Sequence, residues 1–285
     1  MTGEPEGDGV EGDAADRARS REPTPASPLF DATHRGDVLE LAREGTRWLS
    51  TGWRGGPTRS DAAYCVTVPE NWQCEDLGGF VRERLAERGV HADRVAAAAR
   101  GDAPVLFTGV AMQHARGARL GPVEAYATAG VSNPAALPTD PDALRAPPEA
   151  RDGDGDASDR EDGLPDGEHV PGTVNVVVGT TRDLAPGALA NLVAVAAEAR
   201  AATLLDRVGV PGTTSDAVVA ACDPDGERAA FSGSATRVGA AARACVRDAV
   251  LAALDARYED EDPPASVDDA RYGVTTDSRA SVFQP

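Results

Sequence analysis

The chain contains no lysine and no isoleucine, and all 28 of its basic residues are arginine. Alanine, valine, glycine and aspartate are abundant instead. Its 285 residues carry a formal net charge of −19 at pH 7. An acidic surplus of this kind keeps a protein soluble in concentrated salt. The composition therefore indicates a halophilic source with a GC-rich genome.

Basic surfaces and long apolar runs are missing as well. Nucleic acids and anionic membranes attract proteins through basic faces that displace counterions, so neither is predicted as a partner. No uninterrupted apolar run reaches the roughly 18 residues that would span a membrane. Residues 1–20 lack the basic and apolar regions of a secretory signal. We therefore expect a cytoplasmic protein.

Cysteine is scarce, and the four cysteines show no pattern of metal ligands. No two of them form a CxxC pair, and no histidine stands at the spacing of a zinc site, so the sequence predicts no metal. A cytoplasmic protein keeps its thiols reduced. We expect Cys65, Cys222 and Cys245 to be free thiols buried as small apolar side chains.

The remaining composition divides the chain into one domain with acidic extensions. Residues 1–28 and 259–285 are rich in acids and poor in aliphatic residues, and we interpret both as acidic tails, the first one disordered. Residues 139–170 have the same composition, which predicts a disordered acidic insertion. A single domain over residues 29–258 remains, and 41% apolar residues suffice for its core.

Apolar patterns within this domain predict an α+β or α/β fold. Continuous β-branched runs and turn residues predict strands at 62–68, 123–131, 173–179 and 216–222. Helical spacing predicts three main helices at 75–88, 187–208 and 239–257. We expect a mixed β-sheet covered by these helices. Residues 29–51 contain short apolar clusters and are interpreted as strands and turns rather than a long helix, and 223–231 as a hairpin-like segment.

A turn before the last predicted strand, in the stretch PGTTSDAVVAACD at 211–223, concentrates groups suited to amide chemistry. Thr213, Thr214 and Ser215 are candidate nucleophiles or hydrogen-bond donors, and Asp216 is a candidate to activate or orient water. Backbone amides around Gly212 are candidates for an oxyanion site. The alternative is a glycine turn whose hydroxyls cap the backbone and whose aspartate closes an Asx turn.

Another candidate is Glu198, which is surrounded by alanines in the 187–208 helix. Its carboxylate is either turned to solvent and paired with an arginine, or buried with a raised pKa that suits acid–base catalysis. Asn133 and Asn175 are amides placed after and within apolar strands. They either bind substrate or are satisfied polar groups of the core.

Ser50 and Thr51 precede a glycine-rich loop that contains Trp53. Glycines allow the backbone of such a loop to approach a ligand closely. The indole of Trp53 offers a flat apolar surface to a large ligand or, equally, to the core. Ser132 follows a predicted strand in the same manner and joins the predicted substrate-binding set.

Four stretches in this order resemble the adenosylcobinamide amidohydrolase family of corrinoid salvage. They are LSTGWRGG at 49–56, TAGVSNPA at 128–135, GTVNVVV at 172–178, and EARAATLL followed by GTTSDAVV within 198–219. The resemblance extends over roughly residues 29 to 255, and the tails and the acidic insertion lie outside it. It favours contact of the 212–219 turn with substrate, and catalytic roles for Asp216, Glu198, Thr213 and Thr214.

The resemblance implies hydrolysis of the amide that links aminopropanol to the corrin ring of adenosylcobinamide, which gives adenosylcobyric acid and 1-amino-2-propanol for cobalamin synthesis. The corrinoid brings its own cobalt, so the protein is expected to supply no cofactor. The four loops are expected to face one pocket large enough for the macrocycle. Two alternatives are a corrinoid-binding protein without catalysis and a serine or threonine amidase with another substrate.

Overall fold

The computed structural model describes residues 28–69, 72–145, 173–264, 266–270 and 272–285. Within these ranges lies a mixed sheet of eight strands, in the order β4, β3, β2, β9, β8, β6 and β5, with β1 paired to β2. The β3/β4 and β8/β9 pairs are parallel and the other pairs are antiparallel. The strands are β1 Asp31–Arg35, β2 Val38–Ser50, β3 Gly56–Thr67, β4 Val105–Thr108, β5 Arg116–Leu120, β6 Val123–Thr128, β8 Asn175–Leu184 and β9 Val218–Ala229.

Four α-helices accompany the sheet in the described ranges, which confirms the predicted single domain with a mixed sheet. They are α1 Leu77–Glu87, α2 Ala92–Arg100, α3 Pro186–Val208 and α4 Arg237–Arg257. Helix α2 is not among the three helices predicted from the sequence, because its apolar segment is as short as a strand. Gly101 ends it in the left-handed conformation, with φ of 83°, a region that glycine enters without a steric penalty.

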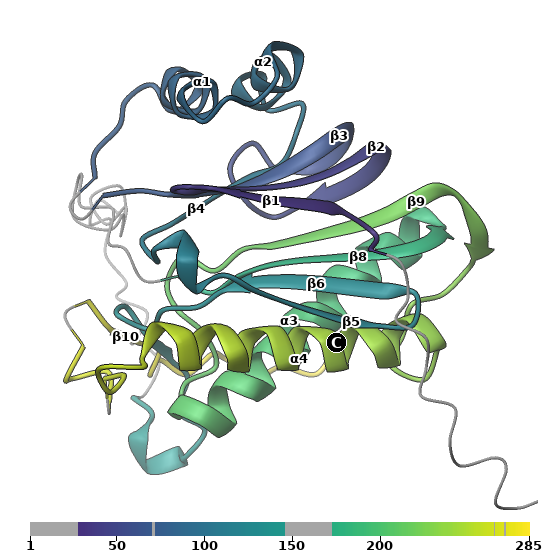
Figure 1. Ribbon diagram of the computed structural model, residues 1–285. Coiled ribbons are helices and arrows are strands. Elements are labelled where there is room, and N and C mark those ends of the chain that lie inside the picture. The colour runs from purple at the N-terminus through teal and green to yellow at the C-terminus, as the bar shows by residue number, and fades with distance from the viewer. Residues whose placement is uncertain (1–27, 70–71, 146–172, 265, 271) are drawn as a thin grey trace, which may run out of the picture.

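The sheet curls so that its two halves face each other, and helices cover both outer faces (Figure 1). The space between the halves holds apolar side chains from both, including Leu41 of β2, Cys65 of β3 and Val219 of β9. A second cluster lies between one half and α3 and α4. A third lies between the other half and α1 and α2. The core therefore consists of three apolar clusters, one between the two halves of the sheet and one between each half and its helices.

Strand β2 joins the two halves of the sheet. It continues for 13 residues, and together with β1 and the turn between them it confirms the strands and turns expected at 29–51. A shift in register between Ala42 and Thr46 bends the strand. Gly45 within this bulge has φ of 67°. The first part of β2 pairs with β1 and the second part with β9, which the bend permits.

The hairpin predicted at 223–231 is wrong, because β9 extends through Ala229. Beyond a shift in register it continues to pair with β8, where Arg182 lies opposite Glu227. The turn residues that suggested a hairpin form the bulge at this shift. A Cβ on Gly226 would lie 2.1 Å from the carbonyl oxygen of Thr181. Glycine is therefore needed there for close contact between the strands.

Helix α3 is long and apolar enough, by length and composition, to cross a membrane. Its buried side chains, Leu192, Ala196 and Leu204 among them, belong instead to the apolar cluster shared with β9 and α4. Buried helices of globular domains have this composition. We therefore interpret α3 as a core helix of the domain.

The acidic extensions fall only partly within the described residues. The predicted disorder of 1–27 and 146–170 concerns residues that lie outside them, whereas at 139–145 the prediction is wrong, because a short 3₁₀ helix and a bridge are formed there. From the segment predicted as a C-terminal tail, β10 Val274–Thr275 pairs in parallel with β7 Ala135–Ala136. An isolated bridge joins Arg145 to Ser278 just beyond the short 3₁₀ helix Pro141–Ala143. This part of the tail returns to the segment that follows Asn133.

Burial controls the chemistry of the cysteines, and the free, buried state predicted for Cys65, Cys222 and Cys245 is confirmed. Burial raises the pKa of the Cys65 thiol from 9.0 to about 12 and that of Cys245 to about 11. It raises the pKa of Cys222 as well. Only the thiolate is a good nucleophile. The partly exposed Cys74 is therefore the accessible thiol.

Iodoacetamide at pH 8 is expected to label Cys74 in the folded protein and all four cysteines after unfolding, as counted by mass spectrometry. Because burial raises these pKa values above 9.0, the buried neutral thiols stabilise the folded state below pH 9. That contribution is lost as the pH rises through the folded pKa values near 11 and 12. Rapid native labelling of Cys65 would contradict this assignment.

Candidate active site

A cavity of about 250 Å³ lies where the ends of several strands meet. The loop after β2, the end of β4, the start of β8 and the turn before β9 all contribute to it. Its wall is largely apolar, and every described residue in it is uncharged. The lining residues are Gly52, Trp53, Val68, Leu77, Leu106, Phe107, Thr108, Gly109, Thr173, Asn175, Ser215 and Ala217.

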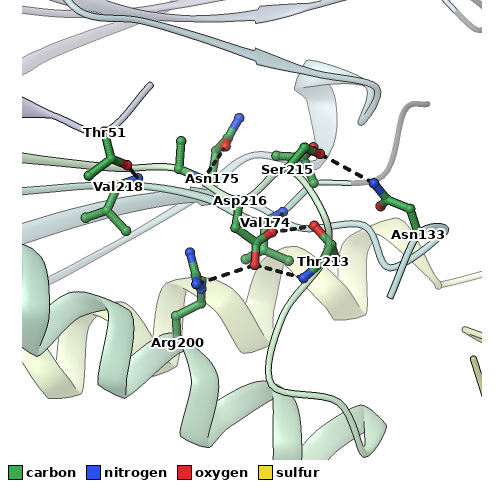
Figure 2. A network of polar contacts seen from close by, with 11 residues as sticks. Thr51, Asn133, Val174, Asn175, Arg200, Thr213, Ser215, Asp216 and Val218 are labelled. Carbon is green, nitrogen blue, oxygen red and sulfur yellow. Dashed lines mark hydrogen bonds and ion pairs between the residues drawn. The ribbon is translucent and has the colours of Figure 1, made fainter. Parts of the chain in front are cut away.

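The carboxylate of Asp216 holds the turn beside this cavity in shape (Figure 2). Its Oδ1 accepts a hydrogen bond from the Val174 amide at 2.8 Å and another from the Thr213 hydroxyl. Its Oδ2 accepts from the Thr213 amide at 2.9 Å. The side chain is 6% exposed. Asp216 thus closes the turn, as the Asx alternative predicted, and fastens it to the segment before β8.

Arg200 of α3 completes this arrangement, and sequence reasoning did not select it. Its Nη2 lies 3.5 Å from Oδ2 of Asp216, and its side chain is 14% exposed. The two opposite charges are therefore paired with each other beside the turn. The available signal was its position on the otherwise apolar face of the helix, in register with Leu192, Ala196 and Leu204.

Two hydroxyls, those of Thr173 and Ser215, form the polar group of the cavity wall. Their oxygens are 2.6 Å apart, and Nδ2 of Asn133 lies 3.4 Å from Oγ of Ser215. One hydroxyl hydrogen lies between the two oxygens, and among the described residues the other has no acceptor. Whichever residue donates within the pair, one O–H donor remains for a ligand. Thr173 was not selected from sequence, because its neighbours indicated only a buried strand.

The backbone amides expected to form an oxyanion site around Gly212 are already occupied. The Thr213 amide donates to Asp216, and the Thr214 amide donates to the carbonyl oxygen of Asn133 at 3.1 Å. Oγ1 of Thr214 accepts a hydrogen bond from Nδ2 of Asn133 at 2.6 Å. The oxyanion site predicted there is therefore wrong for these two amides. Asn133 fixes the turn from the side of β7.

Three other predicted residues hold the strand ends that form the cavity. Asn175 lines it, donates to the Phe107 carbonyl at 2.8 Å and accepts from the Ala217 amide at 3.2 Å. Oγ1 of Thr51 accepts from the Val218 amide at 2.9 Å, and Oγ of Ser50 accepts from the Gly52 amide. The amide of Asn175 thereby ties β4 to the turn. Because both ends of the Asn175 amide have hydrogen-bond partners, Asn175 agrees with the alternative of a satisfied polar group in the core.

Two predicted residues lie away from this group. Glu198 turns to solvent on α3, where its side chain is 64% exposed and pairs with Arg243 of α4 at 3.4 Å. This is the exposed alternative, and the catalytic role of Glu198 stays a prediction. Ser132 lies beside Tyr258, whose hydroxyl accepts a hydrogen bond from the Val131 amide. Burial raises the pKa of Tyr258, so this hydroxyl stays neutral.

The cavity is much smaller than the macrocycle-sized pocket expected from the sequence. Ligand pockets for drug-sized molecules measure about 300–1,000 Å³, and a corrinoid is larger than such a molecule. Aromatic packing is the physical reason. Phe107 lies against both Trp53 and Trp72, with ring centroids 5.9 and 5.4 Å apart, and against Phe80 at 6.2 Å. These rings fill the space beside the cavity.

Such a cavity, uncharged and bearing hydroxyl and amide groups on one wall, suits a polar ligand without charge. Among the described residues, no group of three or more His, Cys, Asp or Glu could hold a metal ion. The sequence model of the adenosylcobinamide amidohydrolase family matches residues 30–262.

A Halobacterium salinarum protein named adenosylcobinamide amidohydrolase is 55% identical to this chain over 258 residues. The aligned region covers 90% of this chain and 100% of that protein. The chain therefore belongs to the adenosylcobinamide amidohydrolase family, a family of hydrolases, which confirms the resemblance found in the sequence.

Proposed function

We propose that this chain hydrolyses the amide between the aminopropanol arm and the corrin ring of adenosylcobinamide. Water adds to the carbonyl carbon, the C–N bond breaks, and the leaving nitrogen takes up a proton. The products are adenosylcobyric acid and 1-amino-2-propanol, and the acid returns to cobalamin synthesis. One observation carries the proposal: three of the four family-like stretches line a single cavity, and Asn133 of the remaining stretch binds its wall.

The hydroxyl pair of Thr173 and Ser215 is the proposed contact to the scissile amide. Amide hydrolysis places negative charge on the carbonyl oxygen in the transition state, and a fixed donor stabilises that charge. The pair has one hydroxyl hydrogen available. The proposed role of Asp216 and Thr213 is to hold the turn that carries Ser215. Their own polar atoms are hydrogen-bonded to each other and are therefore not offered to the substrate.

The remaining proposed substrate-binding residues act mainly on the shape of the site. Trp53 contributes its ring to the cavity wall. Asn133 and Thr214 support the turn, and Thr51 fastens the loop after β2 to β9. The proposed setting is the cytoplasm of a halophile. The proposed ligand is a corrinoid that carries its own cobalt, so the protein supplies no metal.

The test is turnover by the purified full-length chain in concentrated salt, with adenosylcobyric acid detected by chromatography. Release of the acid supports the proposal. Corrinoid binding without product selects the non-catalytic alternative. A covalent intermediate on Thr213 or Thr214, formed from another amide, selects the general amidase. Neither binding nor product with adenosylcobinamide would overturn the corrinoid assignment.

A further inference from the structure

We infer that the cavity receives only the amide arm of the substrate, which is neutral. We further infer that the uncharged wall of the cavity favours departure of the charged products. The inference rests on the proposed function and concerns what the site selects. Its basis is the size of the cavity, the chemistry of its wall and the change of charge in the reaction.

The volume of the cavity admits the amide arm of the substrate but not the corrin ring. A volume of 250 Å³ corresponds to about eight water molecules at roughly 30 Å³ each. A short amide arm with a hydroxypropyl end fits this space, whereas a corrin ring with its cobalt does not. The macrocycle therefore remains outside the mouth of the cavity. Recognition within the cavity consequently concerns the bond to be cleaved and the small amine beyond it.

The wall matches such an arm in polarity. Val68, Leu77 and Leu106 offer apolar surface to methylene and methyl groups. The hydroxyl pair of Thr173 and Ser215 offers one hydrogen and free lone pairs to an amide or hydroxyl group of the arm. Two further polar side chains of the wall have partners: Asn175 bonds to Phe107 and Ala217, and Oγ1 of Thr108 accepts from the Val110 amide.

The reaction changes the charge of what occupies the cavity. The arm is a neutral amide, while the products at neutral pH are a carboxylate and an alkylammonium ion. A buried charge needs a paired group, and no described residue of the wall carries one. Arg200 and Asp216, the nearest ion pair to the turn, are bonded to each other outside the lining. Cleavage thus converts a well-matched ligand into two poorly matched ones.

The test compares two small probes on the full-length chain in concentrated salt. N-(2-hydroxypropyl)propanamide reproduces the neutral arm without a corrin, and 1-amino-2-propanol is the charged leaving group. Calorimetry and competition with adenosylcobinamide are both measured. At pH 7 the amide is expected to bind and compete at least tenfold more tightly than the amine. The difference is expected to shrink at pH 11, where the amine is neutral.

A paired variant locates the binding. Thr173→Val with Ser215→Ala is expected to weaken the amide probe about tenfold, as loss of one buried hydrogen bond would. Thr203→Val with Ser234→Ala is the control, since it makes the same two changes away from the cavity and is expected to leave binding unchanged.

Either of two results would overturn the inference: amine and amide binding equally at pH 7, or no binding of the amide to a chain that turns over adenosylcobinamide. Absence of turnover with selective binding of the amide probe would instead count against the proposed function.

Discussion

Replacing Asp216 with alanine is expected to lower the free energy of unfolding by about 3–5 kcal/mol and to remove most turnover. The change leaves the charge of Arg200 largely buried without its partner. It also removes the acceptor of the Val174 and Thr213 amides. The turn would then no longer hold Ser215 against Thr173. Denaturant unfolding and turnover, measured in the same buffer, give both quantities.

A double-mutant cycle separates this positioning role from the base role predicted from sequence. Asp216→Asn and Arg200→Leu are made singly and together. If the carboxylate acts by holding the turn, the two changes are expected to couple by about 0.5–3 kcal/mol. The double variant should then recover turnover relative to Asp216→Asn alone. Stable folding with no recovery in the double variant would instead support Asp216 as the base.

The sequence predicted the elements that have strong local signals. The run at 173–178 is β-branched except for Asn175, and strand β8 occupies most of it. Pro186 and Gly209 mark the ends of α3, where the proline occupies the first turn and the glycine is left-handed. These features depend on neighbours within a few residues, so pattern reasoning found them.

Features that depend on packing between distant segments were missed. The cavity is small because Phe107 meets Trp53 and Trp72, and no local pattern shows which aromatic rings will meet. Thr173 became a candidate only when Ser215, 42 residues further along the chain, was found beside it. Arg200 shared the apolar spacing of its helix, but only the packing of α3 against the turn shows that it pairs with Asp216. The sequence thus identified the turn, and tertiary contacts determine which of its hydroxyls faces the cavity.

Loss of both cavity hydroxyls, in the variant Thr173→Val with Ser215→Ala, is expected to lower kcat by about 10²–10³-fold, as removal of an oxyanion donor does elsewhere. Each single variant is expected to lose much less, because the hydroxyl that remains is freed from its partner and can donate to the substrate. Thermal unfolding of each variant checks that the fold is intact, with Thr203→Val and Ser234→Ala as controls.

The opposite pattern would identify Ser215 as a nucleophile. Ser215→Ala alone would then be as inactive as the double variant, and Thr173→Val would keep most of its activity. A serine nucleophile also needs a base within hydrogen-bond reach. Among the described residues, the side chains that contact Ser215 are Thr173 and Asn133, and neither can accept its proton as a base at neutral pH. We therefore expect no acyl-enzyme on Ser215 in the mass spectrum during turnover.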